Sequence, residues 1–319
     1  MKAACLSKYG PPAEVLSIKE VDKPAPKDNE VLIKVHAVSA NRTDHYVIVG
    51  QWLMRPFTGL FKPRKPFIGS DFAGHVEAIG PAVTSFKVGD KVMGFGGVAG
   101  VGSHAEYITF PESKGIVLMP GNMNYEQAAG CVEATFYAAS GILKIKPAPG
   151  QSALVYGATG AIGSADVQFL KYHGVYVTAV CGGENADLVR SLGADKIIDY
   201  KTQDVTKDED RYDFIIDAVG KLSFMKCKHL LKKTGVYLPS DGMVNIFLVP
   251  FTRVFGGKKV LFNAPGNIKG TLNFIKELCE KGSFRPVIDR VYPFDKIAEA
   301  FTYVGTKQKI GNVIIKMEG

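Results

Sequence analysis

The sequence lacks paired cysteines and long apolar runs. Its cysteines are odd in number, lie far apart and never occur as CxxC: Cys5, Cys131, Cys181, Cys227 and Cys279. Such spacing encodes neither a disulfide framework nor a zinc knuckle, and it fits a reducing compartment. No stretch approaches the roughly 20 apolar residues of a membrane span, and the N-terminal residues lack an apolar signal core. We therefore expect a cytoplasmic protein without a membrane partner.

The basic residues are not collected into a long basic run. The 319 residues include 39 basic and 31 acidic side chains, a formal net charge of +8, but the lysines are scattered. A dedicated nucleic-acid surface needs clustered Lys and Arg, so a nucleic-acid partner is not expected. Repeats and low-complexity tracts are missing too. The length and the 46% hydrophobic content suffice for two domains with sizeable cores.

The clearest motif is the stretch ALVYGATGAIG at residues 153–163. An apolar strand runs into three glycines, and we predict a helix over 164–172 and a second strand over 175–180. A backbone without side chains approaches a pyrophosphate closely, and the N-terminus of the following helix then faces the anion. Because strand, turn, helix and second strand complete a βαβ unit, the pattern predicts a dinucleotide-binding site.

Hydrophobic periodicity divides the chain into two domains. Residues 1–120 form short strand patterns separated by turns, with a glycine-interrupted strand at 69–80, and predict a mostly β, partly open barrel. Residues 121–269 predict an α/β domain with a doubly wound parallel sheet, beginning with a helix over 125–143. Residues 270–319 are expected to return to the first domain. The remaining predicted strands are 31–38, 196–200, 212–220, 235–238, 259–262, 287–291 and 312–316.

Strand ends locate the predicted cofactor groove. In an open parallel sheet the ligand lies across the carboxyl ends of the strands. Ala218, Val219 and Gly220 follow one predicted strand, and the turn at Ser240, Asp241 and Gly242 follows the next. We expect both segments to line the groove.

Several segments together resemble the medium-chain dehydrogenase/reductase superfamily, and specifically its zinc-free, quinone-oxidoreductase-like branch. They are GPPAEVL, EVLIKVHAVSANRTD, GSDFAGHVEAIG, VGDKV, GSHAEY, GATGAIG, LVRSLGADKIIDY, DAVG and PVIDRVYPFDKIAEAF. The resemblance covers nearly the whole chain. It implies a GroES-like barrel domain formed by both termini, a Rossmann domain between them, and a homodimer built through the edge of the Rossmann sheet.

The zinc ligands of the related alcohol dehydrogenases are replaced in this sequence. Asn41, Ser70 and Glu133 stand at the three aligned positions, so only one oxygen ligand remains. Residues 94–107 contain no cysteine, so the structural-zinc lobe is missing as well. The histidines at 36, 45, 75 and 104 are interpreted as structural or solvent-facing, because none pairs with another at metal spacing. We expect no zinc.

Without a metal to polarise a carbonyl, a conjugated acceptor suits this site better than a simple ketone. The resemblance places Asn41, Asp44, Tyr46 and Trp52 beside the nicotinamide and the substrate. Tyr46 is the preferred proton-donor candidate, although plain packing is an equal alternative for it, and Trp52 is placed to stack on a planar substrate. Glu133 and Tyr137 are secondary candidates.

The end of the second Rossmann strand bears on cofactor choice. It consists of Cys181, Gly182 and Gly183 with no acid at its tip, which favours NADPH, and Tyr200 matches a family position near the 2′-phosphate. Glu184 follows closely and keeps NADH open. The complete set of predicted cofactor-binding residues is Gly157, Ala158, Thr159, Gly160, Ala161, Ile162, Gly163, Cys181, Gly182, Tyr200, Ala218, Val219, Gly220, Ser240, Asp241, Phe262, Ala264 and Asn312.

These observations predict a zinc-independent oxidoreductase that transfers hydride from NADPH to a planar electrophile, a quinone or an α,β-unsaturated carbonyl. Two alternatives stay open: a zinc-free aldehyde/ketone (alcohol) dehydrogenase, and a non-enzymatic nucleotide- or RNA-binding regulator. The segment 51–66, with its aromatic and basic residues, is either a lid or a packed surface loop.

Overall fold

The computed structural model describes residues 1–97, 100–240, 243–254, 257–262 and 266–317. The chain separates into two compact units. The first contains Met1–Phe136, Asn267–Lys281 and Arg285–Gly319, and the second contains Tyr137–Gly266 and Gly282–Phe284. The first unit therefore extends about one helix further than the boundary at residue 120 expected from the sequence, while the return near residue 270 lies close to the expected place.

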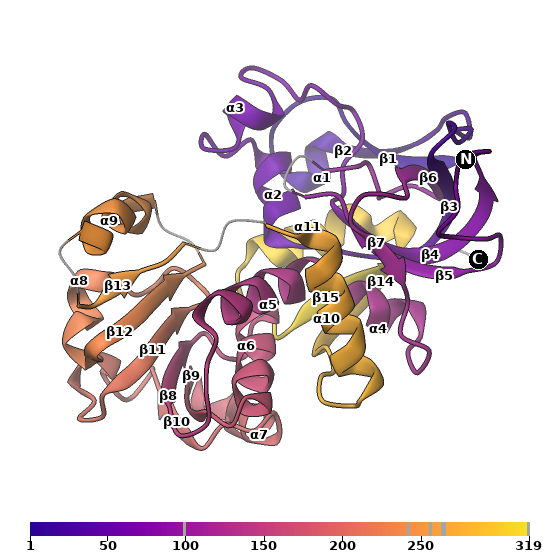
Figure 1. The fold of residues 1–319 in the computed structure, drawn as a ribbon. Helices are drawn as coiled ribbons and strands as arrows, with labels where there is room; N and C mark the ends of the chain where they lie inside the picture. Colours follow the sequence, from indigo (N-terminus) through magenta and orange to yellow (C-terminus); the bar gives the residue numbers. More distant parts are fainter. Residues whose placement is uncertain (98–99, 241–242, 255–256, 263–265, 318–319) are drawn as a thin grey trace. The chain divides into compact units, whose positions relative to one another are not determined.

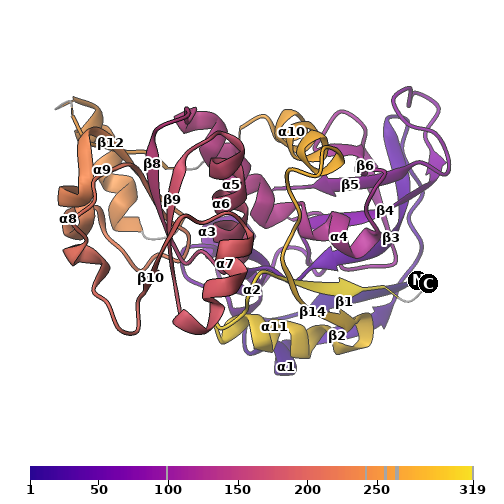
Figure 2. The ribbon, with the colours of Figure 1, turned by 90° about the horizontal axis from the view of Figure 1, so that it is seen from below.

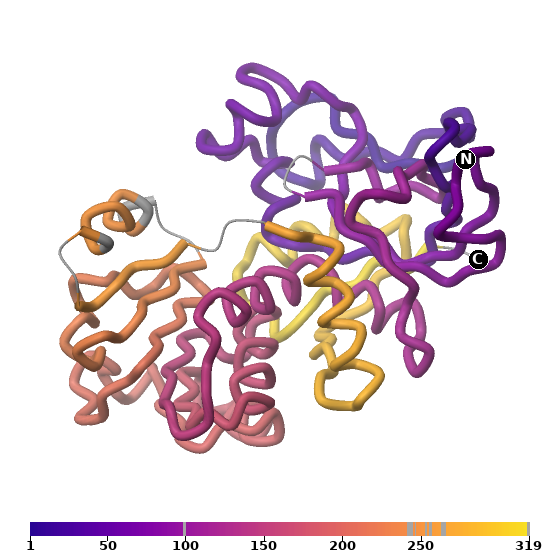
Figure 3. The backbone as a smooth tube through the Cα atoms, viewed as in Figure 1, coloured from indigo at the N-terminus to yellow at the C-terminus, as the bar shows by residue number. Residues whose placement is uncertain are grey.

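The first unit is built mainly on antiparallel strands. A seven-stranded sheet has the path β14-β15-β3-β4-β5-β7, with β6 also paired to β3, and β1 pairs with β2 in a separate ribbon. The C-terminal strand β15 pairs with β3, so segments from the N-terminal and C-terminal parts of the chain share one sheet and lie side by side in the tube of Figure 3. The strands are β1 (Lys2–Leu6), β2 (Leu16–Glu20), β3 (Glu30–Ser39), β4 (Asp71–Ile79), β5 (Lys91–Phe95), β6 (Tyr107–Pro111), β7 (Ile116–Leu118), β14 (Ile288–Pro293) and β15 (Asn312–Lys316).

Helices of the first unit lie around this sheet. Alternating apolar residues of the strands, such as Val31, Ile33 and Val35, are fully buried and form its core together with Phe301 from α11. The helices are α1 (Pro12–Val15), α2 (Arg42–Val49), α3 (Arg55–Thr58), α4 (Tyr125–Gly130), α10 (Ile268–Glu280), η4 (Phe294–Lys296) and α11 (Ile297–Gly305).

The second unit contains a parallel sheet with the strand order β10-β9-β8-β11-β12-β13. Two β-α windings therefore run outward from β8 and β11 in opposite directions, which is the doubly wound Rossmann arrangement that the sequence predicted. Figures 1 and 2 show α6 and α7 on one side of the sheet and α8 on the other. The strands are β8 (Ser152–Tyr156), β9 (Tyr176–Cys181), β10 (Lys196–Asp199), β11 (Tyr212–Asp217), β12 (Leu231–Pro239) and β13 (Lys259–Val260). The helices are α6 (Ala161–Tyr172), η1 (Gly183–Asn185), α7 (Ala186–Ser191), η2 (Val205–Lys207), α8 (Phe224–Cys227), η3 (Lys228–Leu230) and α9 (Met243–Val254).

Two predicted elements have different boundaries in the structure. The single helix expected over 125–143 is two helices, α4 and α5 (Glu133–Ile145), separated by Cys131 and Val132. The strand expected over 212–220 ends at Asp217, whose carboxylate accepts hydrogen bonds from the next backbone N–H groups and turns the chain away. Among the described residues, no helix is long and apolar enough to cross a membrane.

Candidate functional site

Gly157 and Gly160 lie between β8 and α6, where the two windings of the sheet diverge, and Gly163 is the third residue of α6. Gly160 caps α6 without a side-chain hydrogen bond, and the first helical bond is Ser164 N–H to Gly160 C=O at 2.8 Å. The N–H groups of Ala161, Ile162 and Gly163 therefore have no acceptor inside the helix. Together with the helix dipole, these groups make the turn suitable for binding an anion.

Each glycine in this turn meets a different steric requirement. Gly157 has φ +79°, and a Cβ there would lie 2.6 Å from a methyl carbon of Val219. A Cβ at Gly163 would overlap the carbonyl oxygen of Gly157. At Gly160 the nearest atom to an added Cβ is the Gly157 oxygen at 3.4 Å, so the protein itself does not demand glycine there. The space beside Gly160 fits a group that the chain does not supply, and the pyrophosphate of a dinucleotide is such a group.

Asp217 organises the loop that faces this turn. Its buried carboxylate accepts hydrogen bonds from the N–H groups of Gly220 at 2.9 Å and Leu222 at 2.7 Å, and burial raises its pKa. The same loop continues from Ala218, whose N–H binds Tyr156 C=O at 3.0 Å. Sequence reasoning named the loop residues but missed the aspartate that shapes them, although the DAVG segment contains it.

The ends of β9 and β10 meet beside a polar pocket of about 430 Å³, lined by Tyr156 and by residues 200–205. Cys181 and Gly182 are buried, whereas Tyr200 is exposed. The Lys201 ammonium lies 2.7 Å from the Glu184 carboxylate, and both side chains are more than half exposed. The sequence indicated Glu184 as a residue that bears on cofactor choice. Lys201, which follows the end of β10, comes close to Glu184 only in the folded structure.

The other predicted cofactor-binding residues lie partly in the glycine turn and at the start of α6, and partly elsewhere in the chain. Ala158 and Ala161 are buried, Thr159 and Ile162 partly buried, and the side chain of Ser240 is exposed at the end of β12. The carbonyl of Phe262 accepts a hydrogen bond from Lys144 at 2.8 Å. Asn312 belongs to the first unit, where its amide donates to Val287 C=O at 3.0 Å. Asp241 and Ala264 lie outside the described residues.

A buried polar cluster in the first unit joins three of the residues singled out in the sequence. Asn41 is the N-cap of α2, and its Oδ1 accepts the Asp44 N–H at 2.7 Å. The Asn41 Nδ2 donates to Asp44 Oδ2 and to Ser70 Oγ, both at 3.0 Å. The Ser70 hydroxyl lies 3.3 Å from the same Asp44 oxygen. Amide and hydroxyl donors thus surround a single carboxylate.

Burial dominates the acid–base chemistry of this cluster. It raises the pKa of Asp44 to about 7, with the charge of Glu133 as the second cause, whereas the hydrogen bonds from Ser70 and Asn41 oppose the shift. It also lowers the pKa of His104, whose Nε2 is 3.8 Å from Asp44 Oδ2, to about 4. Burial thus favours the neutral form of His104 and brings the pKa of Asp44 into the neutral range. Neither property is readable from the sequence.

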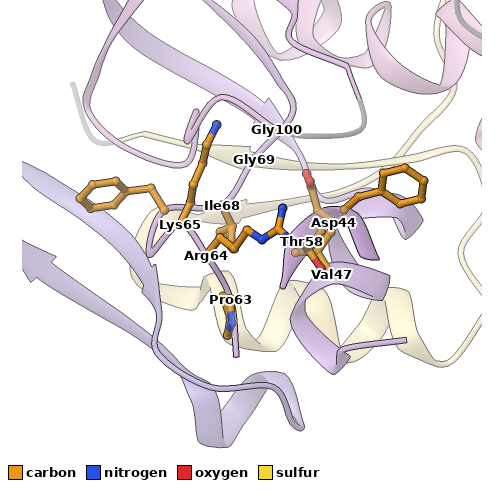
Figure 4. A pocket seen from close by; sticks show the side chains of 11 residues that line it. Asp44, Val47, Thr58, Pro63, Arg64, Lys65, Ile68, Gly69 and Gly100 are labelled. Carbon is orange, nitrogen blue, oxygen red and sulfur yellow. The ribbon is translucent and has the colours of Figure 1, made fainter. Parts of the chain in front are cut away.

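Asp44 also lines a pocket of about 200 Å³. Its apolar walls include Val47, Phe57 and Ile68, and two cations, Arg64 and Lys65, lie at its border. In Figure 4, Arg64 extends toward the side of the pocket where Asp44 lies. The pocket thus presents apolar surface to a planar molecule and one titratable acid to its polar atoms.

The other catalytic candidates occupy different environments. Glu133, the first residue of α5, is buried and accepts a hydrogen bond from Thr43 Oγ1 at 2.7 Å; burial raises its pKa. Tyr46 is partly buried on α2, and because residues two apart on a helix face different sides, it does not share the face of Asp44. Trp52 is exposed and does not line the pocket. Tyr137 is partly buried on α5 within the second unit.

The described residues contain no group of three or more His, Cys, Asp and Glu side chains that could hold a metal ion. Two of the histidines interpreted as structural or solvent-facing are bonded to each other. His36 Nε2 and His75 Nδ1 are 2.9 Å apart, and the two rings stack, so these two residues do pair. They come from the neighbouring strands β3 and β4, where His75 lies opposite Lys34 and the register shifts at His36.

Comparisons with known proteins agree with this architecture. Residues 27–121 match the family described as Alcohol dehydrogenase GroES-like domain, and residues 192–315 match the family described as Zinc-binding dehydrogenase. The protein of Triphysaria versicolor named Quinone-oxidoreductase QR1, chloroplastic, is 34% identical over 99% of this chain and 98% of its own length. The Arabidopsis thaliana protein named NADPH-dependent alkenal/one oxidoreductase, chloroplastic, is 32% identical over 99% of this chain and 79% of its own length.

The solved structure of the quinone oxidoreductase from Coxiella burnetii shares the fold. It matches with a TM-score of 0.91 at 24% identity, over 100% of this chain and 99% of that chain.

Proposed function

The chain belongs to the medium-chain dehydrogenase/reductase superfamily, in its quinone-oxidoreductase-like branch, and on this basis we propose that it reduces quinones or α,β-unsaturated carbonyls with NADPH. The observation that carries the proposal is the buried cluster of Asn41, Asp44 and Ser70 beside an apolar pocket. The cluster offers hydrogen-bond donors and an acid of nearly neutral pKa. Its donor set contains no thiolate, so we propose that the reaction is independent of zinc.

The cofactor and the buried polar cluster would serve different steps of the reduction, hydride transfer and proton transfer. NADPH, when bound, would supply the hydride for the electrophilic carbon of the conjugated acceptor. The negative charge that reaches the acceptor oxygen needs stabilisation and a proton. We propose that the hydrogen-bonded cluster stabilises this charge and that Asp44 in its protonated form delivers the proton. One hydride and one proton complete the reduction. The glycine turn and the first turn of α6 would hold the pyrophosphate of the cofactor.

A substrate panel tests this function. We expect NADPH oxidation with small quinones and enones, little with saturated aldehydes and ketones, and the same rates after treatment with a chelator. Turnover confined to saturated carbonyls would favour the zinc-free aldehyde/ketone dehydrogenase instead. Loss of activity on chelation, restored by zinc, would contradict zinc independence.

Cofactor preference is proposed to depend on the Glu184–Lys201 pair. A 2′-phosphate brought to this end of β9 is attracted by Lys201 and repelled by Glu184. We expect Lys201→Met to raise the KM for NADPH about tenfold with little effect on NADH, and Glu184→Gln to lower the KM for NADPH. Lys171→Met, which removes another exposed ion pair of this unit, is the control. Equal effects on both cofactors would contradict this role.

The second unit also supports a homodimer. β13 is the last strand of the described sheet, and the neighbouring α9 exposes Phe247, Phe251 and Val254. Unpaired strand edges and exposed apolar side chains are typical of association surfaces. We propose that two copies join there, and expect light scattering to give a dimer mass that Phe251→Ser reduces to that of a monomer. A monomeric parent protein would contradict this. A cytoplasmic location stays a prediction.

A further inference from the structure

The segment between α2 and β4 carries positive charge only. Residues 45–70 contain no Asp or Glu, but they include Arg55, Lys62, Arg64 and Lys65. The side chains of Lys62, Arg64 and Lys65 are exposed and form no ion pair within the described part of the chain. For a protein whose basic residues are otherwise scattered, this is a local concentration of unneutralised charge.

The same segment exposes large apolar side chains. The exposed fractions are 68% for Trp52, 70% for Phe57, 57% for Leu60 and 93% for Phe61. Exposed apolar residues that occur singly need no explanation, but a contiguous group with a basic rim is typical of an interaction surface. We call residues 52–65 the docking loop.

The backbone of the docking loop is held in place from within the first unit. The Tyr9 hydroxyl donates to Gly59 C=O at 2.7 Å and lies 3.0 Å from Thr58 Oγ1. The Arg64 N–H donates to Thr58 C=O at 2.8 Å and closes the turn that carries Leu60 and Phe61. These bonds fix a backbone whose apolar side chains point outward, so the exposure is built into the loop.

We propose that the docking loop binds the surface of an anionic lipid bilayer. Aromatic and aliphatic side chains that insert among lipid headgroups, flanked by Lys and Arg that face anionic lipid, are the features of interfacial anchors. An acidic protein surface would match the charge of the loop but would not require a solvent-facing Phe61. The sequence led us to expect no membrane partner because it has no spanning segment, but a peripheral protein needs none.

The docking loop shares residues with the lining of the Asp44 pocket, so attachment to a bilayer would place this pocket near the membrane surface. Phe57, Arg64 and Lys65 belong to the docking loop and also line the pocket that contains Asp44. Figure 4 shows Arg64 and Lys65 in this lining. A lipophilic acceptor dissolved in the bilayer would therefore have a short path to the pocket. This last step rests on the proposed reductase function, whereas attachment to the bilayer does not.

Vesicle binding tests the attachment directly. We would sediment the full chain with vesicles of phosphatidylcholine mixed with phosphatidylserine, and with vesicles of phosphatidylcholine alone. We expect binding to the anionic vesicles that weakens with salt, and roughly tenfold weaker binding of Phe61→Ser and of Lys62→Glu. Neither residue lines the pocket. Val88→Ser and Lys114→Glu, at exposed positions outside the loop, should bind like the parent chain.

Four results would overturn the proposal. The first two are no binding of the parent chain to anionic vesicles, and equal losses of binding in the two control variants. The third is a raised KM of Phe61→Ser for a water-soluble quinone without vesicles, which would make the docking loop a lid. The fourth is a changed molecular mass of Phe61→Ser, which would make the loop an interface between two copies. Turnover of the water-soluble quinone by the parent chain reports on the reductase function separately. Failure of the attachment and failure of the function are thus distinguishable.

Discussion

Replacing Asp44 by asparagine is expected to lower kcat for quinone or enone reduction about 100-fold. Asparagine keeps the size of the side chain and an oxygen that accepts hydrogen bonds from Asn41 and Ser70, but it has no acidic proton. The reaction then depends on water for its proton. Steady-state kinetics with NADPH and one quinone, at saturating concentrations of both, measure the change.

The pH profile should separate proton transfer from a structural role of Asp44. Burial raises the pKa of Asp44 to about 7, and a general acid is active only in its protonated form. We therefore expect kcat of the parent protein to be level below pH 7 and to fall with rising pH above it. In Asp44→Asn the profile should be flat across this range.

Asp71→Asn is the matched control for Asp44→Asn. Asp71 is an equally buried acid of the same region, but its carboxylate is bound by the backbone N–H and the hydroxyl of Ser39, and it does not line the pocket. The control should retain the pH profile of the parent protein. If Asp44→Asn also retained the profile with a small loss of kcat, Asp44 would not be the proton donor.

Asp44→Asn also has a predictable effect on the pH dependence of stability. Folding raises the pKa of Asp44 from an unfolded value of about 4, so the folded state holds a proton between about pH 4 and 7 that the unfolded state releases. The contribution of Asp44 to stability is therefore fully present below pH 4 and is lost as the pH rises through 7. Asp44→Asn should flatten this part of the pH dependence, as measured by chemical denaturation at several pH values.

Gly160→Ala should weaken cofactor binding without loss of stability, whereas Gly163→Ala should lower the stability of the fold. Since a Cβ at Gly160 meets no protein atom closer than 3.4 Å, the variant should fold normally but bind NADPH roughly 10- to 100-fold more weakly, because the methyl group occupies the pyrophosphate space. A Cβ at Gly163 would overlap the Gly157 carbonyl, so this variant should lose about 3 kcal/mol of stability.

Fluorescence titration with NADPH and thermal unfolding without cofactor measure the two effects. We expect an unchanged Tm for Gly160→Ala and a Tm lower by roughly 10 °C for Gly163→Ala. Gly150→Ala is informative about positive φ alone, because Gly150 has φ +83° but no atom within 4 Å of an added Cβ. Unimpaired NADPH binding by Gly160→Ala would contradict the assignment of the pyrophosphate to this turn.

Local patterns in the sequence predicted the parallel sheet and its glycine turn well. The turn is encoded within eleven consecutive residues, and its steric requirements at Gly157 and Gly163 involve atoms close in sequence or in the adjacent loop. The break between α4 and α5 was missed although Gly130 ends α4, because the alanines on both sides of the break continue the helical pattern. The early end of β11 was missed because a side-chain carboxylate, rather than a turn residue, ends the strand.

The sequence by itself determined the family and the doubly wound parallel sheet of the second unit, because these depend on residue identity and periodicity. Only the tertiary structure determined which charged groups are buried and which of them lie close together. It buried Asp44 and so raised its pKa to about 7, brought Lys201 from beyond the end of β10 to Glu184, and held Phe61 outward beside exposed cations. The physical reason is that desolvation and Coulomb interactions depend on distances through space, which residue spacing along the chain does not specify.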